Sequence, residues 1–413
     1  MIGWSGMNIL WPLLLKKSNC CVDFMKNVRL VVFIFLSLMD IGMGELFAKN
    51  SESYLNSQID SIFKKMKMTG LGIAVTKEDS IIYIKSFGYR DIPSADNDNI
   101  GEPLDNEDLF RIASISKTFI ATVILQLVEE GKLNLDDDVQ NYLKFPLRNP
   151  LFFDDPITIK MLLTHTSSVN DSQKYWSLDI INPNVSKEYF ECYSKTKPGV
   201  VYKYCNFNYL LLGAVIEGVT NNRFDVEIDQ RIMKPLGIHG GFNCNVLESE
   251  KFVKLYRYDK DKGTFKEDDE AYRPYKYQIQ DHYVLGESLG LAYPPSGMKI
   301  TTSNLAKYMM MHMHGGILNG VRILSEDSEK RMRDNYVGKH NYGFSFRQYR
   351  NLIHDTILYG QTGGGFGLKS AMIFDPTHKM GFVIISSGSA SEYIDGYGDI
   401  HKPLIQLLYS FFK

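Results

Sequence analysis

The sequence predicts a mixed α/β (α+β) fold in which one antiparallel sheet, built from both ends of the chain, is flanked by helices and carries an inserted helical domain. Two β-rich hairpins lie far apart, within residues 73–84 and 370–386. Between them, residues 110–290 carry mainly helical or irregular patterns. A chain of 413 residues with 44% hydrophobic content is long enough to bury a large core of this kind.

The N-terminal part of the predicted sheet follows a helix. Residues 53–68 place apolar side chains at helical spacing and lead into the glycines of Gly70-Leu71-Gly72. The β-rich runs 73–75 and 81–84 come next, separated by the polar turn 77–80. This pattern is typical of a β-hairpin.

The C-terminal part repeats this arrangement in reverse. Residues 370–374 and 381–386 flank the turn-forming segment 375–379, which contains Asp375-Pro376. Residues 404–412 are apolar enough for a closing helix that packs on the sheet. Hairpins at both ends of the chain therefore predict strands of one common sheet.

The middle of the chain carries helix-length apolar patterns. They lie at residues 114–130, 158–163, 206–219 and 224–233. Residues 254–283 are rich in Tyr, Lys and Asp, and their apolar residues show little periodicity. This composition predicts an excursion or long loop that can include short strands. The expected domains are an upstream extension with signal peptide (1–48), a sheet domain (49–109 plus 291–413) and a mainly helical domain (110–290).

The N-terminus contains an expected export signal that does not begin at Met1. Met25, Lys26 and Arg29 form a short basic start, and residues 30–39 are almost wholly apolar. That length matches a signal-peptide core and is too short to span a bilayer. Residues 46–48 are the expected cleavage site, and residues 1–24 are interpreted as an upstream extension. The alternative is a disordered tail, because Asp40 interrupts the apolar run. The signal peptide predicts a periplasmic or secreted protein without a stable membrane span after cleavage.

The charge and cysteine content of the chain limit the kinds of binding partner and cross-link that can be expected. The net charge is −2, from 46 Lys+Arg against 48 Asp+Glu, so no general basic field exists to attract nucleic acid or an anionic membrane. A small-molecule or peptide substrate is expected instead. After cleavage the cysteines are Cys192, Cys205 and Cys244, an odd number that predicts no disulfide framework. Neither zinc-type spacing nor a calcium loop occurs, and no metal or cofactor is expected. The sequence does not indicate an oligomeric state.

Three short motifs follow one another along the chain. They are Ser114-Ile115-Ser116-Lys117, Tyr204-Cys205-Asn206 and Gln361-Thr362-Gly363-Gly364. None is specific alone, because Ser-x-x-Lys also occurs at residues 61–64, 194–197, 296–299 and 410–413. The order, the wide spacing and the local context of the motifs carry the information.

Ser114 and Lys117 form a candidate nucleophile and base. Ser114 stands at the start of an apolar-periodic run that ends at Gly131, which places it at a helix N-terminus where the helix dipole favours developing negative charge. Lys117 lies one turn on, within reach of the Ser114 hydroxyl. A partly buried lysine can lose its charge and accept the serine proton. The alternative is a helix-capping serine beside a solvated lysine.

The surroundings of Ser114 argue against that alternative. The segment 110–113, Phe-Arg-Ile-Ala, precedes the serine, and residues 157–168 read Ile-Thr-Ile-Lys-Met-Leu-Leu-Thr-His-Thr-Ser-Ser. From about Gly70 to Gly388 the chain resembles the serine β-lactamase-related family, which includes class C β-lactamases, D-alanyl-D-alanine carboxypeptidases, esterases and D-amino-acid peptidases. The resemblance implies a β-lactamase/transpeptidase-like fold with its cleft where the sheet meets the helical domain.

The resemblance also implies roles for individual residues. Ser114 would be the acylated nucleophile and Lys117 its base. Tyr204, with its pKa lowered by a nearby ammonium, would share the serine proton and later activate water. Asn206 would orient the lysine and the substrate amide. His165 matches a stretch that is usually a structural turn in the family, so direct catalysis by this histidine is the less favoured interpretation.

The third motif would lie on an edge strand that borders the cleft. Gly363 and Gly364 let the backbone approach the substrate, and the N–H groups of Ser114 and Gly364 would form the oxyanion hole. Members of the family usually carry Lys or His where this chain has Gln361. As in the family, Thr362 and Gly363 follow that position. A neutral glutamine offers no positive charge to a substrate carboxylate.

These features together predict an exported serine hydrolase that transfers acyl groups to water, acting on an ester or a small amide or peptide. Gln361 puts β-lactam and D-Ala-D-Ala substrates in doubt, because both present a carboxylate at that position. The alternatives are a β-lactamase or D-Ala-D-Ala carboxypeptidase, or a non-catalytic binder of a peptide or cell-wall fragment.

Overall fold

The computed structural model describes residues 51–94, 100–173, 177–268, 272, 283–291, 293–394 and 396–413. The chain forms two compact units, Met1–Ser61 and Ile62–Lys413. The expected extension and signal peptide, residues 1–48, lie outside the described residues. The first predicted helix runs from residue 51 to residue 65 instead of 53 to 68. Within the described ranges, no helix combines the length and the apolar character needed to cross a bilayer.

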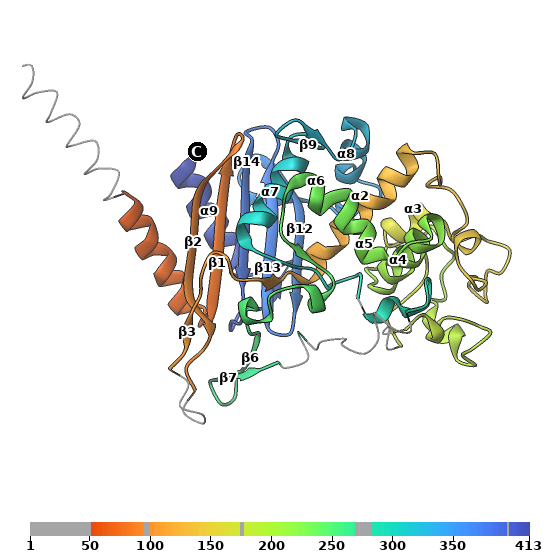
Figure 1. The fold of residues 1–413 in the computed structure, drawn as a ribbon, viewed down its shortest axis with the longest axis horizontal. Coiled ribbons are helices and arrows are strands. Elements are labelled where there is room, and N and C mark those ends of the chain that lie inside the picture. The colour runs from red at the N-terminus through yellow and green to blue at the C-terminus, as the bar shows by residue number, and fades with distance from the viewer. Residues whose placement is uncertain are drawn as a thin grey trace, which may run out of the picture. The chain divides into compact units, whose positions relative to one another are not determined.

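A seven-stranded antiparallel sheet organises the described part of Ile62–Lys413 (Figure 1), with the strand order β11-β12-β13-β14-β1-β2-β3. Its strands are β1 (Gly70–Lys77), β2 (Ser80–Asp91), β3 (Glu102–Pro103), β11 (Arg347–Ile353), β12 (Thr356–Gly365), β13 (Leu368–Asp375) and β14 (Met380–Ser386). β1 pairs with β14 from Leu71 opposite Ser386 to Lys77 opposite Met380. The two predicted hairpins, β1–β2 and β13–β14, are therefore confirmed as neighbours in one sheet.

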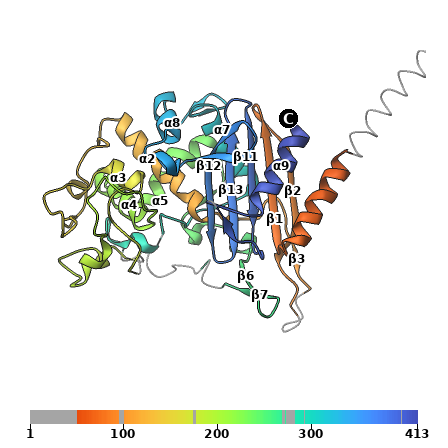
Figure 2. The ribbon, with the colours of Figure 1, turned by 180° about the vertical axis from the view of Figure 1, so that it is seen from behind.

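Helices cover both faces of this sheet (Figure 2). β14 is buried along its whole length, and β1 is buried except for its last residue, as expected for strands with two covered faces. α7 (Thr302–Met313) packs so closely on one face that a Cβ on Gly72 would lie 2.5 Å from the Thr302 hydroxyl oxygen. α9 (His401–Phe412), the predicted closing helix, lies on the opposite face.

The helical region contains each of the predicted middle helices. Its helices are α2 (Ser116–Glu129), α3 (Ile159–Leu163), α4 (Phe207–Thr220), α5 (Phe224–Ile228), a π-helical turn at Asp229–Met233 and α6 (Lys234–Leu236); α8 (Glu326–Arg333) follows later in the chain. α2 and α4 are buried on almost every side, which accounts for their nearly continuous apolar sequences. The division into a sheet domain and a helical domain stays a prediction, because Ile62–Lys413 forms one compact unit.

The remaining strands are short. They are β4 (Phe110–Arg111), β5 (Gly240–Gly241), β6 (Tyr256–Asp259), β7 (Thr264–Glu267), β8 (Lys299–Ile300), β9 (Ile317–Leu318), β10 (Val321–Arg322), β15 (Tyr393–Ile394) and β16 (Tyr397–Gly398). The hairpin β6–β7 supplies strand pieces within the expected excursion 254–283. Much of the rest of that excursion, residues 269–271 and 273–282, lies outside the described residues.

The strand of the third motif differs from the prediction. Gln361 to Gly364 lie on β12, which is an interior strand because β11 pairs beside it, so the prediction of an edge strand is wrong. The pairing of β11 with β12 runs from Ile353 opposite Thr356 to Arg347 opposite Gly360 and stops there. Residues 361–364 therefore pair with β13 but have no β11 residue opposite them. The motif keeps an open side even though its strand is not at the edge.

Candidate active site

Ser114 lies in a tight turn between the sheet and a buried helix. The turn is a 3₁₀ helix, Ala113–Ile115, that leads directly into α2. Ala113 has a φ of +47°, a left-handed conformation that is uncommon for a residue with a side chain. The Ser370 hydroxyl of β13 donates a 2.8 Å hydrogen bond to the Ile112 carbonyl. The sheet thus holds the turn in its strained conformation.

β12 lies directly against this turn. A Cβ placed on Gly363 would lie 2.4 Å from the Ile112 carbonyl oxygen and 2.9 Å from the Ser114 nitrogen. No side chain fits into so small a space, so only glycine allows this approach. The third motif and the nucleophile, almost 250 positions apart in the sequence, are in contact.

Lys117 lies buried beneath Ser114, as the i+3 spacing predicts. Its Nζ is 3.1 Å from Ser114 Oγ, 2.8 Å from Asn206 Oδ1 and 2.9 Å from the Pro295 carbonyl oxygen. Burial lowers the pKa of the lysine to about 7, although the nearby Asp171 carboxylate opposes this shift. A substantial fraction of the amine is therefore neutral at neutral pH.

The neighbours of the neutral amine orient its lone pair. The Asn206 and Pro295 oxygens can only accept hydrogen bonds, and they take the two N–H protons of the neutral form. The lone pair then faces the Ser114 hydroxyl, which can donate to it. This arrangement fits a base that removes the serine proton.

Asp171 fixes Asn206 in the required orientation. Its carboxylate accepts hydrogen bonds from Asn206 Nδ2 at 2.9 Å, from the backbone N–H groups of Asn206 and Phe207, and from the Cys205 thiol. Because the Asn206 amide nitrogen faces the carboxylate, its oxygen faces Lys117. The carboxylate also satisfies N–H groups at the start of α4, where a negative charge is favourable. Sequence reasoning missed Asp171, because no local pattern links it to a helix about 35 positions later.

Tyr204 borders the cavity beside Lys117. The Lys117 Nζ lies 5.0 Å from the centre of the Tyr204 ring. The residue is 37% exposed, yet the protein around its phenol group removes that group from bulk water and raises its pKa well above 10.0. A hydrogen bond with Ser114 acts in the opposite direction and does not offset this effect. The expected lowering of the Tyr204 pKa is therefore wrong. The buried lysine, partly neutral, does not hold the tyrosine as a phenolate.

His165 supports the site from behind. Its Nδ1 accepts a hydrogen bond from the Cys205 N–H at 3.2 Å, so the proton lies on Nε2, which is 3.3 Å from the Tyr342 hydroxyl. Burial lowers the pKa of His165 well below its usual value, and the Lys117 charge adds to this shift. The Asn208 side chain also contacts Nδ1. These contacts occupy both ring nitrogens and agree with the structural role that the sequence favours.

Gln361 is buried, and Tyr342, which also contacts His165, holds its side chain. Its Nε2 donates a 3.0 Å hydrogen bond to the Tyr342 hydroxyl, and its Oε1 accepts from the Thr362 N–H. The Thr362 hydroxyl in turn donates to the Gly396 carbonyl at 2.7 Å. Gln361 is thus a fixed, uncharged part of the cavity wall.

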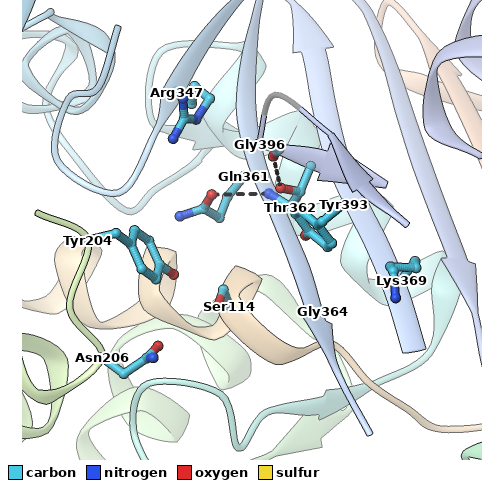
Figure 3. Close-up of a pocket in the computed structure, with 10 residues that line it drawn as sticks. All are labelled: Ser114, Tyr204, Asn206, Arg347, Gln361, Thr362, Gly364, Lys369, Tyr393 and Gly396. Atoms are coloured by element: carbon cyan, nitrogen blue, oxygen red, sulfur yellow. Dashed lines mark hydrogen bonds between the residues drawn. The ribbon is translucent and has the colours of Figure 1, made fainter. Parts of the chain in front are cut away.

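A cavity of about 390 Å³ opens above Ser114 (Figure 3). Its lining consists of Ser114, Tyr204, Asn206, Arg347, Gln361, Thr362, Gly364, Lys369, Tyr393 and Gly396. Six of these residues belong to the predicted site, and the other two predicted residues, Lys117 and Gly363, lie directly against Ser114. The structure therefore brings all eight predicted residues together.

Two cations of the cavity wall were not predicted. Arg347 comes from β11 and packs against Gly396, where a Cβ would lie 3.0 Å from the guanidinium carbon. Lys369 comes from β13, opposite Gly364 in the sheet register. Neither residue belongs to a recognisable motif, so only strand pairing reveals them. Gln361 itself offers no positive charge, but these two side chains bring positive charge into the cavity.

Comparisons with known proteins agree with this geometry. The Beta-lactamase family model matches residues 57–400. Protein flp of Staphylococcus aureus (strain MRSA252) is 30% identical over 202 residues, which span 48% of this chain and 39% of flp. The chain thus matches well under two thirds of the length of that relative.

Solved structures show the same fold. The octameric penicillin-binding protein homologue from Pyrococcus abyssi has a TM-score of 0.67 at 25% identity, over 87% of this chain and 77% of that chain. A class C beta-lactamase has a TM-score of 0.67 at 19% identity, over 88% and 97% of the two chains. Because the family model covers most of the sequence and the fold agrees, this chain belongs to the beta-lactamase family of serine hydrolases.

Proposed function

We propose that the chain is an exported serine hydrolase that transfers an acyl group to water through an acyl-enzyme on Ser114, with an ester or a small amide or peptide as substrate. The observation that carries this proposal is the buried Lys117, which lies 3.1 Å from Ser114 Oγ and has a pKa of about 7. A base with this pKa is half neutral near pH 7 and can accept the serine proton without a large energetic cost.

In the acylation step, Ser114 Oγ attacks the substrate carbonyl carbon while its proton passes to Lys117. The backbone N–H groups of Ser114 and Gly364 are the expected donors to the oxyanion, and such donors are worth about 3 kcal/mol each. Tyr204, a neutral phenol beside Ser114, is suited to pass a proton to the leaving group as the bond to it breaks.

In the deacylation step, a water molecule attacks the acyl-enzyme. The neutral amine of Lys117 accepts a water proton, directly or through Tyr204, and the bond between the acyl carbon and Ser114 Oγ breaks. Asn206 holds the amine in place through both steps. Ser114 regains its proton, and the acid product leaves with the oxygen of the water.

Export is part of the proposal and rests on the basic and apolar segments between Met25 and Ala48. N-terminal sequencing of the protein recovered from outside the cytoplasm tests it. A mature N-terminus at or near Lys49 supports export, and a retained N-terminal segment with the protein confined to the cytoplasm contradicts it.

Hydrolysis of p-nitrophenyl butyrate by the purified chain tests the enzymatic part. We expect turnover that Ser114→Ala abolishes and that Ser61→Ala, the first residue of another Ser-x-x-Lys segment, leaves intact. Mass spectrometry of quenched mixtures should show butyrylation of the peptide that contains Ser114. Saturable binding of peptides or cell-wall fragments without turnover would instead support the non-catalytic binder.

A further inference from the structure

Lys369 projects from β13 into the cavity that contains Ser114. Its aliphatic stem packs against β16, where a Cβ on Gly398 would lie 3.3 Å from the Lys369 Cδ. Its ammonium lies 5.8 Å from the centre of the Tyr393 ring. The small Gly398 thus leaves room for the stem, and the charged end points toward the cavity that Tyr393 also lines.

The ammonium has no carboxylate partner among the described residues. Other partly buried cations of this chain, such as Arg90 and Arg231, lie in ion pairs with carboxylates. No carboxylate of the described segments lies within ion-pair distance of Lys369, and none of their acceptors takes a hydrogen bond from it. Burial lowers the pKa of Lys369, and the Asp399 charge, which raises it, does not offset this effect; the Arg257 charge lowers the pKa further. A half-buried cation without a partner is unfavourable unless a ligand supplies the opposite charge.

The position of the proton donor decides which part of a substrate reaches Lys369. The leaving group must face Tyr204 and Lys117, because these residues carry the proton it needs. Figure 3 shows Tyr204 and Lys369 on opposite sides of Ser114. The acyl chain therefore extends away from Tyr204, toward Tyr393 and Lys369.

Tyr393 gives this side of the cavity an apolar floor. Its ring lies against β12, where a Cβ on Gly364 would be 2.6 Å from the ring carbon Cε2. An acyl chain bound at the Ser114 carbonyl position would pass over this ring before it reaches the Lys369 ammonium. A matching substrate would therefore place its ester carbonyl at Ser114, a short methylene chain over Tyr393 and an anionic group at Lys369.

We propose that Tyr393 and Lys369 form an acyl-side subsite for an acyl group that ends in a carboxylate, so that the substrate is a monoester or monoamide of a short dicarboxylic acid. This inference rests on the proposed function. Ser114 Oγ forms a bond to the ester carbon, the leaving alcohol departs with the serine proton, and water then releases the dicarboxylic acid and restores the serine hydroxyl. The distal carboxylate pairs with Lys369 throughout and takes no part in bond making.

Two matched chromogenic esters test the subsite. Mono-p-nitrophenyl glutarate and p-nitrophenyl butyrate share the leaving group and differ mainly in the terminal carboxylate. We expect the wild-type chain to prefer the glutarate ester in kcat/KM by roughly tenfold or more at low ionic strength. Lys369→Gln should reduce that preference by about tenfold, and Lys369→Arg should retain much of it. Lys262→Gln removes the same charge from the exposed β6–β7 turn and should not alter the preference.

The outcomes separate this inference from the proposed function. A preference that is absent in the wild type, or that Lys369→Gln leaves unchanged, overturns the subsite while Ser114-dependent turnover still supports the hydrolase. If no ester is turned over, the proposed function fails, and a ligand-binding measurement then tests whether the subsite exists. In that case glutarate monoethyl ester should raise the melting temperature of the Ser114→Ala protein, and equal stabilisation of the Ser114→Ala/Lys369→Gln protein rejects the subsite.

Discussion

The Asp171 carboxylate holds the Asn206 amide so that its oxygen faces Lys117. Two distances define this relationship: 2.9 Å from Asn206 Nδ2 to Asp171 Oδ2, and 2.8 Å from Lys117 Nζ to Asn206 Oδ1. An amide is nearly symmetric in shape, so the carboxylate decides which end meets the lysine. The charge of Asp171 also raises the pKa of Lys117 and thereby partly offsets the effect of burial. Both the position and the pKa of Lys117 thus depend on Asp171, an acidic residue outside the three motifs.

Asp171→Asn should lower kcat/KM by roughly tenfold or more, because a displaced Asn206 no longer orients the amine. The same change should shift the pH profile of kcat/KM to lower pH, since loss of the negative charge further lowers the pKa of Lys117. A profile measured on p-nitrophenyl butyrate checks both effects. A lower melting temperature with an unchanged pH midpoint would indicate that Asp171 only stabilises the start of α4.

For the wild-type chain, kcat/KM should rise with pH as a single group loses its proton. The midpoint should lie at about 7, the pKa of Lys117. Below that pH the amine is protonated and cannot accept the serine proton, and above it the amine is neutral. Rates from about pH 5 to about pH 9, corrected for spontaneous hydrolysis, provide the measurement. A flat profile would exclude Lys117 as the base. Lys117→Arg serves as the control, because arginine stays protonated and should be inactive throughout the range.

Tyr204→Phe should reduce kcat by about 10²–10³, because the phenylalanine ring preserves packing but carries no proton. The raised pKa of Tyr204 further predicts that any falling alkaline limb of the wild-type profile lies above pH 10.0. Steady-state kinetics with a good and a poor leaving group would measure the effect. The loss should be larger for the poor leaving group, and equal losses for both would argue against proton donation by this hydroxyl.

Gly363→Ala should lower kcat/KM by at least about 100-fold, because the new methyl group would displace the turn that holds Ser114. The protein should still fold, since the close contacts involve only the turn around Ile112 and Ser114 and the Ser370 hydroxyl. Gly241→Ala provides the control, because its Cβ would meet only the Asn243 nitrogen, at 4.0 Å. Unimpaired hydrolysis by Gly363→Ala would show that the close approach of β12 is dispensable.

Local patterns were sufficient for most elements of the fold. The runs that became β1, β2, β13 and β14 alternate with turn residues, and the buried helices α2 and α4 have apolar residues on nearly every side. Lys117 could be placed beside Ser114 because an i+3 spacing on a helix allows only that face. The edge-strand prediction failed because strand order depends on pairing between distant segments, and β11 gave no motif to reveal it.

The sequence by itself determined the hairpins, the main helices and the set of residues that can carry acyl-transfer chemistry, because periodicity, spacing and side-chain type are local properties. Only the tertiary structure decided the protonation and the surroundings of those residues. Burial of Lys117 lowers its pKa, and the surroundings of Tyr204 raise its pKa, through atoms contributed by many segments. Arg347 and Lys369 likewise entered the cavity through the register of β11 and β13. Electrostatics and cavity shape sum over the whole fold, and no single stretch of sequence contains them.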